Sequence, residues 1–181
     1  GTSLQDKKQI LNEITKSLLN NLNDSFPNIL TDEKTVSDAL STIYSVTKET
    51  FIFLIDEWDY IYREFDNDIK LCNAYTDFLR SLFKNSATLS CIDLVYMTGI
   101  LPIKRYNSQS SLNNFTEYNM LDPYTLTEFV GFTEEEVKSL CKQYNMDIND
   151  MKHWYDGYHY DGVGDLYNPK SVVEALTTSE Y

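Results

Sequence analysis

Residues 51–59 carry the strongest signal for the fold: Phe-Ile-Phe-Leu-Ile-Asp-Glu-Trp-Asp. Five consecutive large apolar residues predict a strand buried on both faces, which is typical of a parallel sheet covered by helices. Asp56 and Glu57 follow where the strand ends, and ligands of open α/β sheets bind at the carboxyl ends of the strands. We interpret these two acids as candidate site residues. In a simpler alternative they are turn or N-cap residues where a buried strand meets solvent.

The order of apolar strand, Asp and Glu resembles the Walker B motif of P-loop ATPases. In this interpretation Asp56 holds a magnesium ion through water. Glu57 polarises the water that attacks the nucleotide. The motif alone predicts a site for a magnesium-bound phosphate at the end of this strand.

A Walker A loop, which such ATPases need, is missing from the chain. That loop requires glycines, so that backbone N–H groups can surround the phosphates, followed by Lys and Ser or Thr. No glycine occurs between Gly1 and Gly99, and Gly-Lys-Ser/Thr occurs nowhere. Residues 1–3 resemble the remnant of an expression tag, which favours a phosphate loop upstream of a truncated start over a lost one. We therefore expect a fragment that is inactive in isolation.

Composition is consistent with one globular domain or one domain with an appended subdomain. The chain has 181 residues, of which 42% are apolar, and a net charge of −13. This charge opposes direct contact with a nucleic-acid backbone or an anionic membrane surface. The widely spaced Cys72, Cys91 and Cys141 predict reduced thiols and a cytoplasmic protein. No apolar run reaches transmembrane length.

Apolar periodicity to about residue 121 alternates between helix and buried strand. We expect helices over about 4–22, 35–48 and 71–84, strands over 51–55 and 92–97, and a weaker strand near 118–121. This alternation predicts an α/β fold, with the parallel sheet of part of a P-loop NTPase flanked by helices. Residues 1–123 are assigned to this part.

Residues 124–181 are expected to form a mostly helical lid subdomain with a short hairpin. Thr133 and Glu136 have the spacing of a capping box at the start of a helix. Asp147 can cap the next helix, and Asn168 followed by Pro169 starts the last one. A hairpin-type turn is predicted at residues 161–162.

Taken together, these features resemble the bacterial AAA-ATPase-like family, which is related to archaeal-type ATPases. The resemblance depends on the order and spacing of several short blocks, each weak by itself. The blocks are residues 54–59, 97–100, 129–137 and 154–158, the last leading to 167–172.

The resemblance implies site residues, cofactors and missing parts. Asp56 and Glu57 match Walker B, and Thr98 matches sensor 1, a polar side chain that reaches toward the γ-phosphate. Magnesium and ATP are implied as cofactors of the intact parent. No cofactor is expected on this fragment, because ATP should bind only when the upstream phosphate loop is present. Members of the family often carry a downstream PD-(D/E)xK nuclease-like domain. Trp58 stands where the family usually has Tyr, an aromatic replacement of small consequence.

Four further residue groups leave alternatives open. Lys104 and Arg105 could reach a γ-phosphate or be solvated loop charges. Asp59 could support the site from behind or cap the following helix. Residues 153–165 contain two His and several Asp that could bind a transition metal, although their spacing matches no known site. Aromatic residues at 154–160 could stack on bases, which the neighbouring acids oppose.

Two functions are consistent with these patterns. The first is a fragment of a P-loop ATPase that carries Walker B and sensor 1. The alternative is a non-catalytic protein-interaction module on a degenerate ATPase scaffold. Without the phosphate-loop strand, one flank of strand 92–97 is expected to be unpaired, so the chain should bind a protein partner or self-associate there.

Overall fold

The computed structural model describes residues 4–102, 112–121 and 123–180, in two compact units. The first unit spans residues 1–115 and the second residues 116–181. The sequence predicts this division after residue 123, a few residues further along the chain. Each unit has its own sheet and its own core, and each is described by itself.

The first unit is built on two parallel strands, β1 (Phe51–Ile55) and β2 (Ile92–Met97). Both strands were predicted from the sequence and are confirmed. The pairing shifts by one residue near the start of β1, where the Thr50 hydroxyl donates a 2.5 Å hydrogen bond to Asp93 Oδ2. The unit's helices are α1 (Leu4–Ser25), α2 (Val36–Thr47), α3 (Tyr60–Glu64), α4 (Ile69–Phe83) and α5 (Ser86–Leu89).

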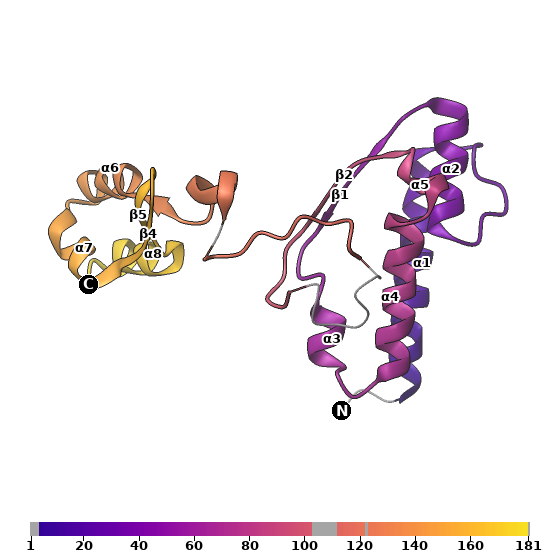
Figure 1. Ribbon diagram of the computed structural model, residues 1–181, viewed down its shortest axis with the longest axis horizontal. Coiled ribbons are helices and arrows are strands. Elements are labelled where there is room, and N and C mark those ends of the chain that lie inside the picture. Colours follow the sequence, from indigo (N-terminus) through magenta and orange to yellow (C-terminus); the bar gives the residue numbers. More distant parts are fainter. Residues whose placement is uncertain (1–3, 103–111, 122, 181) are drawn as a thin grey trace. The chain divides into compact units, whose positions relative to one another are not determined.

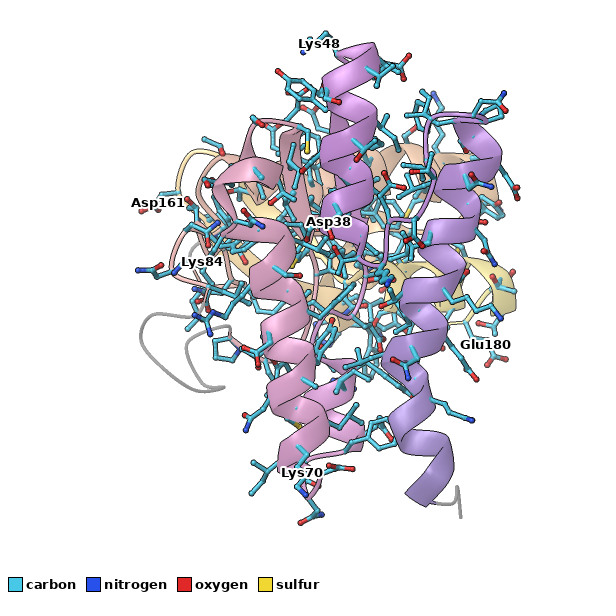
Figure 2. The ribbon with its side chains drawn as sticks, turned by 90° about the vertical axis from the view of Figure 1, so that its right-hand side faces the viewer. Asp38, Lys48, Lys70, Lys84, Asp161 and Glu180 are labelled. Carbon is cyan, nitrogen blue, oxygen red and sulfur yellow. The ribbon has the colours of Figure 1, made fainter. Side chains whose placement is uncertain are left out.

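Helices α1, α2 and α4 pack on one another and lie along the same face of this sheet (Figures 1 and 2). Their starts follow local rules. Thr35 accepts the Asp38 N–H at 3.1 Å ahead of α2, and Asp68 accepts the Leu71 N–H at 3.0 Å ahead of α4. The core between helices and sheet includes Leu40, Ile61, Leu79, Leu82 and Phe83.

Among the described residues of the first unit, no helix covers the opposite face of the sheet, which corrects the prediction of a strand buried on both faces. Side chains alternate along a strand, so Phe51, Phe53 and Ile55 point toward the helices. Ile52 and Leu54 point away and are 63% and 74% exposed. On β2, Leu94 and Tyr96 are 52% and 48% exposed. The apolar run therefore predicted the strand correctly but not its burial, because helices of this unit cover only one face.

The second unit contains the three predicted helices and the predicted hairpin, together with a further short strand that extends the hairpin to an antiparallel sheet. The strands are β3 (Phe132–Thr133), β4 (Asp156–Tyr160) and β5 (Gly164–Tyr167), in the order β3-β5-β4. The helices are α6 (Glu134–Tyr144), α7 (Ile148–Tyr155) and α8 (Pro169–Thr178), preceded by the 3-10 helix η2 (Tyr124–Phe129). Residues 118–121 form no strand, contrary to prediction.

Local capping explains where the helices of this unit begin. Thr133 and Glu136 form the predicted capping box, in which each side chain bonds the other residue's backbone N–H. Asp147 accepts the Asn149 N–H at 2.8 Å, and Asn168 accepts the Lys170 N–H at 2.9 Å. The predicted turn at residues 161–162 connects β4 to β5. These predictions are confirmed.

In the part of the chain that the structure describes, no helix has the length and apolar character needed to cross a membrane.

Candidate functional site

Thr98 connects the carboxyl ends of β1 and β2 through four hydrogen bonds. Its N–H donates to Ile55 O at 2.9 Å, and its carbonyl accepts the Trp58 N–H at 2.9 Å. Its hydroxyl donates to Asp56 Oδ1 and accepts the Glu57 N–H at 3.3 Å. The structure thus brings together Asp56, Glu57 and Thr98, three of the four residues predicted to form the site. The Thr98 side chain orients the Asp56 carboxylate directly.

Glu57 is held both by its backbone and by its side chain. Its φ of 50° lies in the left-handed region, which residues other than Gly, Asn and Asp rarely adopt. Its side chain is 58% exposed, and Oε2 accepts a 2.8 Å hydrogen bond from Arg63 Nη2 on α3. The Glu57 hydrogen bond and the charges of Asp59 and Glu57 outweigh desolvation and raise the pKa of Arg63. The guanidinium is therefore a permanent positive charge next to the candidate base.

Asp59 is fully buried and anchors the turn that follows β2. Its Oδ2 accepts the N–H groups of Ile100 at 3.2 Å and Leu101 at 2.9 Å. Arg63 Nε lies 3.1 Å from the same oxygen, at ion-pair distance. Although Asp59 occupies the N-cap position of α3, its side chain makes no cap hydrogen bond there. Of the two roles left open for Asp59, a side-chain helix cap is contradicted, and a carboxylate that supports the site from behind fits the contacts.

Aromatic rings support the turn from inside the unit. Trp58 is 4% exposed and packs edge-on against Tyr62 at 5.5 Å between ring centroids. Its carbonyl accepts a 2.9 Å hydrogen bond from the Tyr75 hydroxyl, and Tyr62 pairs with Thr76 at 2.8 Å. Burial raises the pKa of both tyrosines, which keeps the phenols neutral. A Cβ at Gly99 would lie 2.6 Å from the Trp58 ring, so the strand end needs glycine here.

The donors at the strand ends fit magnesium better than a transition metal. No group of three His, Cys, Asp or Glu side chains that could hold a metal is found among the described residues. Magnesium is usually held by one or two carboxylates together with substrate phosphates and water, so Asp56 with its oriented carboxylate suffices on the protein side. Lys104, predicted to contact the nucleotide, and the neighbouring Arg105 lie outside the described residues.

Asp165, Lys152 and His159 form a cluster of polar contacts near residue 160. Asp165 accepts Lys152 Nζ at 2.7 Å and lies 2.6 Å from His159 Nδ1. Lys152 also lies 3.4 Å from Glu134. Hydrogen bonds from Lys152 and then His159 lower the pKa of Asp165. A lysine thus engages the carboxylate that a metal would need, and we interpret the cluster as a structural tie across β4, β5 and α7.

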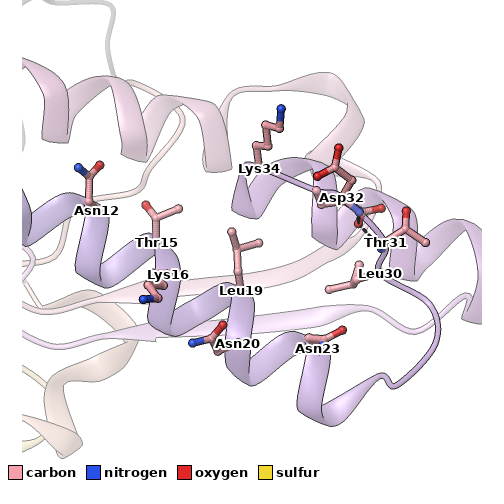
Figure 3. A pocket seen from close by; sticks show the side chains of 11 residues that line it. Asn12, Thr15, Lys16, Leu19, Asn20, Asn23, Leu30, Thr31, Asp32 and Lys34 are labelled. Carbon is pink, nitrogen blue, oxygen red and sulfur yellow. Dashed lines mark hydrogen bonds between the residues drawn. The ribbon is translucent and has the colours of Figure 1, made fainter.

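A shallow hollow of about 510 Å³ lies between α1 and the segment ahead of α2 (Figure 3). It is at the other end of the first unit, because Phe26, just after α1, packs on Phe51 at the start of β1. Its acid Glu33 accepts the N–H groups of Thr31 at 2.7 Å and Asp32 at 3.1 Å. The hollow therefore holds none of the predicted site residues. It is lined by Asn12, Thr15, Lys16, Leu19, Asn20, Asn23, Leu30, Thr31, Asp32, Glu33 and Lys34.

Sequence reasoning missed Arg63 and Tyr75. Arg63 follows Asp59 by four residues, the helical spacing at which opposite charges meet, so this pair could have been predicted from the sequence. Tyr75 lies in the helix predicted over about 71–84, and no local pattern indicates that its hydroxyl bonds a carbonyl 17 residues away.

Comparison with known proteins supports one assignment. The AAA-ATPase-like family model, described as a predicted AAA-ATPase, matches residues 2–107. This range contains Asp56, Glu57, Thr98 and Lys104, whereas the blocks at 129–137 and 154–172 lie outside it. No curated protein and no solved structure matches the chain.

Proposed function

This chain belongs to the AAA-ATPase-like family, and we propose that it carries the Walker B and sensor 1 residues of an ATP-hydrolysing enzyme. In this proposal Asp56 binds magnesium through water, Glu57 polarises the attacking water, and Thr98 reaches toward the γ-phosphate. Lys104 is proposed to contact the nucleotide. Magnesium held there by Asp56 would supply positive charge that neutralises the charge developing during phosphoryl transfer.

The observation that carries the proposal is the hydrogen bonding around Thr98. Its hydroxyl donates to Asp56 and accepts from the Glu57 backbone, so two acids and one hydroxyl meet where both parallel strands end. This edge is where α/β proteins bind their ligands. A hydroxyl that fixes one carboxylate oxygen also reduces the cost of orienting that carboxylate toward a hydrated ion.

The phosphate-binding loop is proposed to come from outside these 181 residues. The sequence has no Gly-Lys-Ser/Thr, and none of its glycines lies within the first unit's helix-to-strand connections before Gly99. The chain by itself should then bind ATP weakly and show no turnover. The natural protein that contains this chain should bind ATP and hydrolyse it.

The test is magnesium-dependent ATP hydrolysis by that natural protein, compared with its Glu57→Gln and Asp56→Asn variants. We expect Glu57→Gln to abolish turnover and keep nucleotide binding, and Asp56→Asn to weaken the dependence on magnesium. Asp77→Asn, which changes an exposed carboxylate of the same unit, is the control and should leave turnover unchanged. Turnover that survives Glu57→Gln would overturn the assignment of the base.

A second candidate function, a protein-interaction module, is favoured by the open apolar face of the first unit. Ile52, Leu54, Leu94 and Tyr96 are all at least 48% exposed on the same side of the sheet. No further strand pairs with β1 or β2 among the described residues. Exposed apolar faces and unpaired edges favour association, and we expect a second copy of the chain as the occupant.

Light scattering on the chain and on Leu54→Lys distinguishes this candidate. A concentration-dependent dimer that Leu54→Lys converts to monomer is expected. A chain that stays monomeric at every concentration contradicts self-association. Absence of nucleotide binding by the natural protein, together with dimerisation, would favour the module over the ATPase.

A further inference from the structure

We propose that Arg63 is a positioning residue for Glu57. Its guanidinium, anchored on the buried Asp59 carboxylate, holds the Glu57 carboxylate in one orientation at the end of β1. This inference rests on the proposed ATPase function, in which Glu57 is the residue that acts on water. Arg63 itself touches neither nucleotide nor water in this proposal.

The three side chains differ in exposure in a way that suits this role. The Asp59 side chain is 0% exposed, that of Arg63 23%, and that of Glu57 58%. A solvent-exposed glutamate loses rotamer freedom only if a partner fixes it. Arg63 can do so because Nη2 donates to Glu57 Oε2 at 2.8 Å, while Nε lies 3.1 Å from Asp59. A planar guanidinium held at one edge presents its other edge in a defined direction.

The position of the Asp59 carboxylate does not depend on Arg63 alone. Asp59 also accepts the N–H groups of Ile100 and Leu101, which follow the strand end at Thr98. Removing the guanidinium therefore leaves Asp59 with two hydrogen bonds and the turn after β2 in place, but frees Glu57. Because Arg63 occupies Oε2, the geometry assigns Oε1 to the water.

The activity test compares Arg63→Ala, Arg63→Lys and the control Arg80→Ala in the natural protein that contains this chain. Arg80 is a suitable control because it is exposed and pairs only locally, with Asp77 three residues earlier. For Arg63→Ala we expect kcat to fall by about 10- to 100-fold, the effect of a misplaced catalytic group, with little change in KM for ATP. Arg63→Lys should recover part of the loss. In a Glu57→Gln background, Arg63→Ala should add nothing.

A second test needs no catalysis and uses the 181-residue chain. The sequence contains three arginines, Arg63, Arg80 and Arg105. Their guanidinium Nη–H signals in a ¹⁵N spectrum, which include the Nη2 group that contacts Glu57, can therefore be assigned with single variants. We expect the Arg63 signal to exchange slowly with solvent, and to exchange faster in Glu57→Gln, whereas Asp77→Asn leaves it unchanged.

The outcomes separate this inference from the function on which it rests. If Glu57→Gln abolishes turnover but Arg63→Ala keeps the wild-type kcat, the ATPase stands and the positioning role is wrong. A higher kcat in Arg63→Ala also overturns the positioning role, because Arg63 would then hold Glu57 in an orientation that slows the reaction. If Glu57→Gln leaves turnover unchanged, both fail. If circular dichroism shows that Arg63→Ala does not fold, the positioning role is tested by the kcat of Arg63→Lys and by the solvent exchange of the Arg63 signal. An Arg63 signal that exchanges equally fast with and without the Glu57 carboxylate would overturn it.

Discussion

The candidate site of the first unit and the helix starts of the second unit depend on polar contacts of different range. In the first unit, Asp59 bonds residues 41 and 42 positions away, and Thr98 reaches back 42 positions to Asp56. In the second unit, the Thr133 capping box spans three residues and the Asn168 cap two or three. The candidate site lies where the contacts are long-range. The site therefore forms only when the sheet has folded, whereas the helix starts of the second unit are determined by short segments of sequence.

The largest expected effect comes from removing the Asp59 carboxylate. Asp59→Ala removes the acceptor of the Ile100 and Leu101 N–H groups and the buried ion-pair partner of Arg63, and we expect it to lower the free energy of unfolding of the first unit by about 3–5 kcal/mol. The second unit should be unaffected. Urea unfolding in a Trp154→Phe background measures this, because the buried Trp58 then reports the first unit alone.

The control for this measurement is Asp77→Ala, which removes an exposed carboxylate and should change stability by less than about 0.5 kcal/mol. Equal losses for Asp59→Ala and Asp77→Ala would show that the buried carboxylate does not hold the turn.

Two glycine substitutions of similar crowding should act on different units. Gly99→Ala places a Cβ 2.6 Å from the Trp58 ring, and Gly131→Ala places one 2.9 Å from Tyr167 O. Overpacking of this kind costs about 1–3 kcal/mol. We expect Gly99→Ala to destabilise the first unit and Gly131→Ala the second, as followed by native-state amide exchange of α4 and α6. If either variant weakens both units equally, the units do not unfold independently.

Loss of a local cap should be smaller and confined to the second unit. Thr133→Ala removes the side chain that accepts the Glu136 N–H, which costs about 1 kcal/mol at typical N-caps. Amide exchange should speed up in α6 and stay unchanged in α4. Thr133→Ser keeps the hydroxyl and serves as the matched control.

The smallest effect expected concerns the pH dependence of the second unit. Lys152 and His159 lower the pKa of Asp165 below its ordinary 3.8, and Lys138 and Lys152 lower that of Glu134 below 4.5. The resulting stabilisation is therefore present above these values and is lost as the pH falls through the lower folded pKa values. Asp165 raises the pKa of Lys152, so this part of the stabilisation is lost only in strong alkali.

Thermal unfolding between pH 2 and pH 5 should show this loss, and Lys152→Met should reduce it. Lys142→Met, on the same unit, is the control and should keep the wild-type profile. Identical acid profiles for all three proteins would contradict a role of the Lys152 pairs.

Sequence reasoning found the elements and the central site residues for identifiable physical reasons. Apolar periodicity located α1, α2, α4, β1 and β2, and cap chemistry located the starts of α6 and α8. The site residues Asp56, Glu57 and Thr98 follow strand ends, where side chains of parallel strands converge.

Burial and long-range pairing were beyond the reach of the sequence. Ile52 and Leu54 are as apolar as Phe53, so nothing in the run distinguishes the open face from the covered one. The hydrogen bond between Tyr75 and Trp58 depends on how α4 docks, and β3 is too short to give a periodic signal. The pairing of β3 with β5 was therefore not predicted, whereas the three helices and the β4–β5 hairpin of the second unit were.

The left-handed backbone at Glu57 places stability and chemistry in opposition at one position. A glycine there would relieve a conformational cost of about 1 kcal/mol and would be chosen by selection for thermal tolerance alone. The same replacement deletes the carboxylate proposed to act on water. Libraries screened only by heat challenge should thus accumulate Glu57→Gly, and its enrichment would mark a residue that is retained for what it does and at a cost to the fold.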